Sequence, residues 1–206
     1  MLSPYLNNGL LMPADVCDAV QWSYDNGRVP IASAEGFIRQ VIGWREYVHG
    51  LYWLWMPGYM DKNELGAHRA LPAAFTDPSS TNMRCVSVCA GDVKQRGWAH
   101  HIQRLMVLGN LALIAGVEPR ALNDWMWESF VDGAEWVMVP NVIGMTLHAD
   151  GGMMATKPYA AGGSKHHPAA KRRTACIPPR SCQSSPRCLR TEFCNRAPLE
   201  SSIAGQ

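Results

Sequence analysis

The chain has 206 residues, of which 47% are hydrophobic and 17% are charged, and this composition excludes a disordered or fibrous protein and suits one globular domain. The formal net charge of +2 hides a division, because residues 1–163 carry −4 and residues 164–206 carry +6. The longest apolar run, residues 105–117, is interrupted by Gly109 and Asn110 and is shorter than the roughly 20 residues that span a bilayer. The opening residues lack the basic and apolar regions of a secretory signal, so we expect a cytoplasmic protein that contacts no membrane.

Two helices are predicted in the first quarter of the chain. One passes through residues 15–25, between Pro13 and Gly27, residue types favoured at a helix start and just beyond a helix end. A longer helix follows, with Ser33 as its N-cap, and ends at the Pro-Gly pair of residues 57–58. Its apolar residues keep a helical period but cover well over half of the circumference, so we expect this helix to be buried.

A charged pair, Arg45 and Glu46, stands in the middle of this apolar helix. A buried charge is costly unless it has a partner, so each of the two needs a polar group inside the protein. An internal salt bridge and an anionic cofactor would both meet this requirement, and the segment alone does not choose between them.

Helical periods also dominate the rest of the chain, and strand signals are scarce. Residues 57–78 are predicted to be irregular, with a short turn near residues 61–65. The remaining predicted helices cover residues 82–94, 100–115, 119–130 and 132–137, and a Gly-rich loop is predicted after Pro140. The predicted fold class is all-α, without an internal repeat.

Four segments carry a resemblance to a known family. They are GFIRQVIGWREYVHGLYWLWMPGY at 36–59, AHHIQRLMVLGN at 99–110, NDWMWESFVDGAEWV at 123–137 and PNVIGMTLHADGGMMATKPYAAGG at 140–163. In this order and at these spacings, the chain resembles the photolyase/cryptochrome superfamily, and within it the bacterial branch that carries an iron–sulfur cluster, called photolyase-related proteins. The resemblance runs from Leu2 to about Gly163 and corresponds to the C-terminal, FAD-binding helical half of such proteins. It therefore implies a partial FAD-binding helical domain at 1–163 and a basic, Cys-, Pro- and Ser-rich tail at 164–206, which we expect to be disordered and unrelated to the family.

The resemblance implies a site for FAD. The cofactor-binding residues that it implies are Ser3, Gln40, Arg45, Arg104, Trp125, Asp132, Met138 and Met145. In the family, an Arg and an Asp that match Arg104 and Asp132 pair beside the reactive edge of the flavin, where a fixed guanidinium stabilises the charge gained on reduction. Ser3 matches a Ser that contacts the FAD phosphates from a helix start. From the residues alone, an ordinary salt bridge between two helices is the preferred interpretation of the Arg and Asp.

The adjacent pair His100 and His101 is implied to be catalytic. Side chains of neighbouring residues on a helix point about 100° apart, so the two imidazoles cannot face one ligand from one stripe. The resemblance places His101 beside the flavin and the DNA lesion, where a protonated imidazole can give a proton to a radical anion. A surface His next to a core His is the alternative that the residues leave open.

Two positions depart from the family pattern. Trp125 matches the position nearest the flavin in an aromatic relay for electrons, but Met126 stands where the branch usually has the next aromatic residue. Met138 stands where a polar or acidic side chain is expected to face the flavin ring. Both departures put a complete site in doubt, and core packing remains an alternative role for the Trp residues.

The cysteines are a further point of comparison with the family. Cys85 matches the first ligand of its iron–sulfur cluster, whereas the other ligands are expected in a C-x-x-C pair near residue 173. In their place, Cys176, Cys182, Cys188 and Cys194 follow one another every six residues, a pattern that is not typical of metal sites. We therefore expect no assembled cluster, and we interpret the tail as the product of a shifted reading frame, with a metal- or nucleic-acid-binding tail as the alternative.

Three functions are compatible with these features. The first is light-driven repair of ultraviolet-damaged DNA, either pyrimidine dimers or six-four photoproducts, by an FAD-containing monomer. The second is a blue-light sensor of the cryptochrome type. The third is a non-functional remnant, since we expect the family's N-terminal domain and part of its phosphate-binding residues to be missing. We expect this to weaken FAD retention and to impair repair, so that little light-driven repair is left.

Overall fold

The computed structural model describes residues 2–160, and this region is helical, as predicted. The first elements are α1 (Ser3–Asn7), α2 (Pro13–Asp25), α3 (Ile31–Ile38), the π-helix η1 (Arg39–Arg45) and α4 (Glu46–Trp55). Three short 3-10 helices follow, η2 (Gly58–Asp61), η3 (Ala73–Phe75) and η4 (Pro78–Ser80). The predictions for the tail at 164–206 fall outside the described residues, and the domain boundary at 163 stays a prediction.

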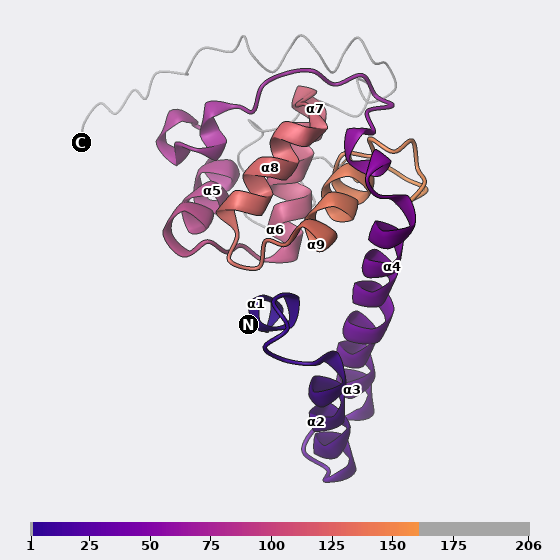
Figure 1. The fold of residues 1–206 in the computed structure, drawn as a ribbon. Coiled ribbons are helices and arrows are strands. Elements are labelled where there is room, and N and C mark those ends of the chain that lie inside the picture. Colours follow the sequence, from indigo (N-terminus) through magenta and orange to yellow (C-terminus); the bar gives the residue numbers. More distant parts are fainter. Residues whose placement is uncertain (1, 161–206) are drawn as a thin grey trace, which may run out of the picture.

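The second half of the described region forms a helical bundle (Figure 1). Its elements are α5 (Arg84–Arg96), α6 (His101–Gln103), η5 (Arg104–Gly109), α7 (Asn110–Ala115), α8 (Pro119–Ser129), α9 (Glu135–Val139) and η6 (Pro140–Thr146). Within the described part of the chain the only β-type pairing is an isolated bridge between Arg69 and Val117, so the all-α prediction is confirmed. None of the described helices is long and apolar enough to cross a membrane.

The bundle has one large apolar core. Its largest fully buried side chains include Tyr59, Phe75, Leu108, Leu122 and Ile143, which come from five different elements or their flanks. Burial of such side chains contributes about 1.5–3 kcal/mol each relative to full exposure. The core therefore fixes the relative positions of α5, η5, α8 and η6, and these are the elements that carry or flank most of the predicted site residues.

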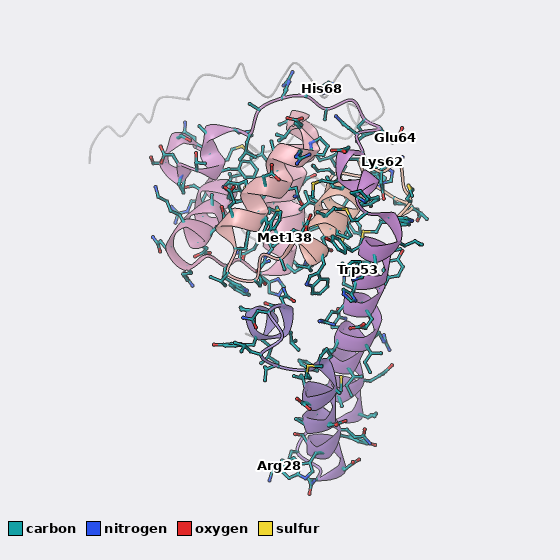
Figure 2. All side chains as sticks on the ribbon, viewed as in Figure 1. Arg28, Trp53, Lys62, Glu64, His68 and Met138 are labelled. Carbon is teal, nitrogen blue, oxygen red and sulfur yellow. The ribbon has the colours of Figure 1, made fainter. Side chains whose placement is uncertain are left out.

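The N-terminal helices project from this bundle as an arm (Figure 1). Helices α2 and α3 pack against each other as a hairpin, and α3, η1 and α4 form one continuous rod that leads back to the bundle. Arg28, between α2 and α3, lies at the outer tip of the hairpin (Figure 2). Helix α1 lies between the hairpin and the bundle.

The prediction that the long rod is buried is wrong. Its large apolar side chains at Phe37, Ile42, Trp44, Tyr47, Trp53 and Leu54 are exposed, and only Ala34, Val41 and Val48 are buried. A helix with one neighbour has only one covered face, whatever the width of its apolar stripe. The N-cap is also different, since the helix begins at Ile31 after Pro30 in extended conformation, and Ser33 lies inside its first turn.

The predicted loop after Pro140 is also wrong in its first half. Helix η6 continues from α9 through residues 140–146, and six of its seven residues are buried. The Gly and Pro in this segment indicated a loop, but the apolar side chains of Val142, Ile143 and Met145 pack inside the protein, and tertiary packing outweighs local propensity. The helix predicted at 132–137 begins at Glu135. The turn predicted near residues 61–65 is present at Glu64 and Leu65, after the 3-10 helix η2 ends at Asp61.

Candidate functional site

Arg104 and Asp132 form a bidentate ion pair, as predicted. Nη1 of Arg104 lies 2.8 Å from Oδ1 of Asp132, and Nη2 lies 3.0 Å from Oδ2. The side chain of Arg104 is 15% exposed and that of Asp132 is 7% exposed, so water screens the pair only weakly. Two parallel charge-assisted hydrogen bonds give the guanidinium a defined direction.

Two further contacts hold the guanidinium. Its Nε donates to the main-chain oxygen of Ala99 at 2.8 Å, and its central carbon lies 4.1 Å from the ring centroid of Phe130. Three of the N–H groups are used by these hydrogen bonds, so two remain for another acceptor. The arrangement is therefore a fixed cation with spare donors, which suits a group that gains negative charge.

A glycine next to Asp132 allows the loop between α8 and α9 to fold tightly. A Cβ atom added to Gly133 would lie 2.8 Å from the main-chain oxygen of Phe130 and still closer to that of Trp127. Because main-chain atoms cannot move aside like a flexible side chain, any larger residue would displace this loop. Gly133 thus explains how the carboxylate reaches Arg104.

Ser3 and Asn7 complete the surroundings of Asp132. The hydroxyl of Ser3 donates to Oδ2 of Asp132 at 2.7 Å, and Nδ2 of Asn7 donates to the main-chain oxygen of Asp132 at 2.8 Å. A hydroxyl has one proton, so in this arrangement Ser3 has no donor left for a phosphate. The role of Ser3 as a phosphate ligand stays a prediction, and its observed partner is the carboxylate.

Sequence reasoning missed Asn7 and Phe130. Asn7 stands four residues after Ser3, so both side chains lie on one face of α1, and this spacing of polar residues was the available signal. Phe130 connects Arg104 with Trp125, whose ring centroid lies 5.9 Å away, and no local pattern distinguishes it from other core aromatics.

The two histidines have different surroundings. Nδ1 of His100 accepts a hydrogen bond from the main-chain N–H of Ile102, and Gln103 bonds back to the His100 N–H, so His100 caps helix α6. His101 is exposed, but the protein around its inner side removes enough water to lower the pKa of its imidazole, and the charges of Arg104 and His100 lower that pKa further. The pKa of His101 therefore depends in part on the charge of Arg104.

Several predicted site residues lie on π-helices. Gln40 and Arg45 belong to η1, Arg104 begins η5, and Met145 belongs to η6. Such wide turns are rare and are frequent at functional sites. This common feature supports the group as a candidate site, although the structure brings only part of it together.

Arg45 lies near α9 rather than near Asp132. It forms an ion pair with Glu46, and its guanidinium carbon lies 4.9 Å from the ring centroid of Trp136. Among the described residues, its buried Nε has no hydrogen-bond partner. The adjacent charges therefore pair with each other, and one donor of Arg45 is left without an acceptor in this part of the chain.

Gln40 is exposed and does not contact the Arg104–Asp132 pair. It lines a surface depression of about 450 Å³ on the arm, together with Arg39, Gly43, Trp44 and Tyr47. The structure therefore leaves Gln40 apart from the residues around Asp132.

The predicted aromatic and methionine positions lie in the core. The ring of Trp125 packs edge-on against Phe75, with centroids 4.9 Å apart, and against Phe130. Met138 is buried on α9 within the bundle (Figure 2). Met145 is buried in a second, smaller cluster with Val48, Leu105 and Met154. The interrupting Met126 is buried as well, and Trp127 beside it is exposed.

Cys85 is exposed on α5, and Cys89, one turn further on, is buried. Burial, followed by the proximity of Cys85 and Asp92, raises the pKa of the Cys89 thiol to about 11. Among the described residues, no three His, Cys, Asp or Glu side chains are grouped as metal ligands. The four tail cysteines lie outside the described residues.

Two known proteins are similar in sequence to this chain. The chain is 49% identical over 164 residues to a (6-4) photolyase of Agrobacterium fabrum, a match that covers 80% of this chain and 32% of the relative. It is 41% identical over 54 residues to an uncharacterised protein of Acanthamoeba polyphaga mimivirus, which covers 26% of this chain and 44% of that protein. No protein-family model matches the chain.

An all-α bundle with a buried Arg–Asp pair beside a His, together with these matches, defines a helical domain of the photolyase type. The chain belongs to the photolyase/cryptochrome superfamily, as its motifs predicted. It spans about a third of the length of the photolyase that it matches.

Proposed function

We propose that this chain is the FAD-binding helical part of a flavin-dependent DNA photolyase that repairs ultraviolet-damaged DNA with light. The observation that carries the proposal is the Arg104–Asp132 pair, buried and bidentate, with His101 beside it. The similarity to a (6-4) photolyase over most of the chain supports the same reaction class. Six-four photoproducts or pyrimidine dimers in DNA are the proposed substrates.

The residues around Asp132 fit a flavin in part. Arg104 has two unused N–H groups and a position that four contacts fix, and a charge that develops on a ring edge needs donors that do not have to reorganise. The Nε of Arg45, beside Trp136, is a second donor that lacks a partner among the described residues. Arg104, Asp132 and Arg45 are therefore the residues that would hold the cofactor.

Each side chain then has a defined task. Reduced FAD, when bound, supplies an electron to the DNA lesion on absorbing light. Arg104 stabilises negative charge beside it, and Asp132 keeps Arg104 in place. His101 is the proton donor of the site, and His100, whose Nδ1 is used in the helix cap, sets the start of α6 and so the position of His101.

Three features support weak binding of FAD by this chain. Met138 and Met145 are buried among apolar side chains and offer no hydrogen bond to a flavin. The Ser3 proton is used by Asp132. Gln40 lies on the arm, apart from this group. If the chain repairs neither lesion in the experiment below, a sensor of the cryptochrome type and an inactive remnant are the two alternative functions.

We further propose that the family's iron–sulfur cluster is not a cofactor of this chain. Cys85 is exposed, and its neighbour Cys89 is buried with a raised thiol pKa, which disfavours the thiolate that binds iron. Stoichiometric iron in the protein purified without oxygen, lost on replacing Cys85 with Ser, would contradict this statement.

The decisive experiment measures flavin binding and repair with the full chain. Excess FAD is added to the chain, and the fraction of chains with bound flavin is read from the absorption spectrum after gel filtration. In the repair assay, the chain is mixed with oligonucleotides that contain a single six-four photoproduct or a single dimer, and the mixture is irradiated with blue light. For the unchanged chain, we expect less than one bound flavin per chain and light-dependent repair of one of the two lesions. For His101→Ala, we expect repair to be lost while the amount of bound flavin stays at the wild-type level.

A matched control is His68→Ala. His68 is exposed on the irregular segment at the top of the view, on the opposite side of the bundle from α1 (Figures 1 and 2), so its replacement should leave repair unchanged. Bound flavin without repair of either lesion would favour the sensor. No bound flavin at any concentration would favour the remnant.

A further inference from the structure

We propose that helix α1 is a positioning clamp, in which Ser3 and Asn7 fix Asp132 and thereby fix the guanidinium of Arg104. The role of Arg104 toward a flavin rests on the proposed function, but the clamp itself is a property of the protein without ligand. Ser3 and Asn7 are positioning residues, since they act through Asp132.

The first support is the complete set of partners around Asp132. Its carboxylate accepts two hydrogen bonds from Arg104 and one from Ser3, and its main-chain oxygen accepts one from Asn7. A carboxylate that is bound by Arg alone can turn together with the guanidinium. Here the Ser3 hydroxyl is a second donor to the Asp132 carboxylate, and Asn7 binds the main chain of Asp132, so the plane and the position of the carboxylate are both held. Helix α1 thus restrains the one side chain that orients Arg104.

The second support is the way in which α1 is attached. In the part of the chain that the structure describes, the other hydrogen bonds of residues 2–11 stay within that segment. Leu6 is the buried residue of α1. The attachment of α1 to the bundle by hydrogen bonds is therefore concentrated on Asp132, across sequence separations of 129 and 125 residues.

The third support is that Arg104 influences His101. Burial is the first cause that lowers the pKa of His101, the positive charge of Arg104 is the second, and Asp132 is the ion-pair partner of that guanidinium. If Asp132 moves away, Arg104 acts more strongly on His101, and the imidazole becomes harder to protonate. A structural anchor for α1 alone would have no such effect.

The test uses the full chain without flavin or DNA. Nuclear magnetic resonance follows the Nε–H of Arg104 and the titration of His101 in Ser3→Ala, Asn7→Ala and the conservative Ser3→Thr. We expect Ser3→Ala to speed the solvent exchange of the Arg104 Nε–H about fivefold, as the loss of one hydrogen bond would. We also expect the His101 midpoint to move to lower pH, and Ser3→Thr to restore both values.

Asn8→Ala is the matched control, because Asn8 bonds to the N–H of Leu10 within the same segment. It should change neither signal. Unchanged Arg104 exchange and an unchanged His101 midpoint in both Ser3→Ala and Asn7→Ala would overturn the clamp, even if their melting temperatures fall. Absence of repair by the unchanged chain, together with the expected response of the His101 midpoint in Ser3→Ala, would instead refute the proposed function and leave the clamp intact.

Discussion

The substitution Asp132→Asn tests the site most directly. It keeps the shape of the side chain but removes the charge that compensates Arg104, which is 15% exposed. Removing one partner of a buried pair costs about 3–5 kcal/mol, because the other charge stays buried. Arg104 keeps the Ala99 carbonyl and the Phe130 ring, so we expect the lower end, about 3 kcal/mol. For a domain of this size, that loss corresponds to a fall of about 6–12 °C in melting temperature.

Urea unfolding followed by circular dichroism measures this loss. The matched control is Asp61→Asn, which breaks the exposed pair of Asp61 with Arg120, whose side chains are 73% and 58% exposed. That pair should contribute less than about 1 kcal/mol. The double variant Asp132→Asn/Arg104→Met should be less destabilised than the sum of its single variants, because no unpaired charge remains. A loss in Asp132→Asn no larger than in Asp61→Asn would refute the reasoning that the pair is buried and coupled.

Three further predictions concern neighbouring features. Gly133→Ala should destabilise the protein by about 1–3 kcal/mol, because the new Cβ meets main-chain oxygens. Gly91→Ala, where the Cβ would enter open space beside α5, should stabilise the protein by about 0.5–1 kcal/mol, and thermal melts compare the two variants. Because the pKa of His101 is lowered in the folded state, the unfolded state binds more protons than the folded state, and the free energy of unfolding should fall as the pH drops below about 6.5. His101→Gln should remove this part of the pH dependence of unfolding. Tyr59→Phe removes the buried hydrogen bond of 2.6 Å to Asp150 and should cost about 1–3 kcal/mol in urea unfolding, and a neutral result would mean that water replaces the hydroxyl.

The local sequence determined much of the helical framework. Proline at helix starts and glycine after helix ends placed α2, α8 and the end of α7 within a few residues of their observed bounds, because capping and backbone preferences act over one turn. The motifs also identified Arg104 and Asp132 as a pair, and this interaction is observed. Each of these features depends on neighbouring residues or on a motif.

Only the tertiary structure decided which surfaces are covered and which distant residues meet. The aromatic rod of α3, η1 and α4 has the pattern of a buried helix, but α2 covers one side of its outer part and α9 and η6 cover one side of α4, so Trp44 and Trp53 are exposed. The segment after Pro140 has the residues of a loop, but it continues as η6 because its side chains fill the core. The hydrogen bond from Ser3 to Asp132 joins residues 129 positions apart, and no local pattern encodes such a contact, because it exists only when the whole bundle has brought the two ends together.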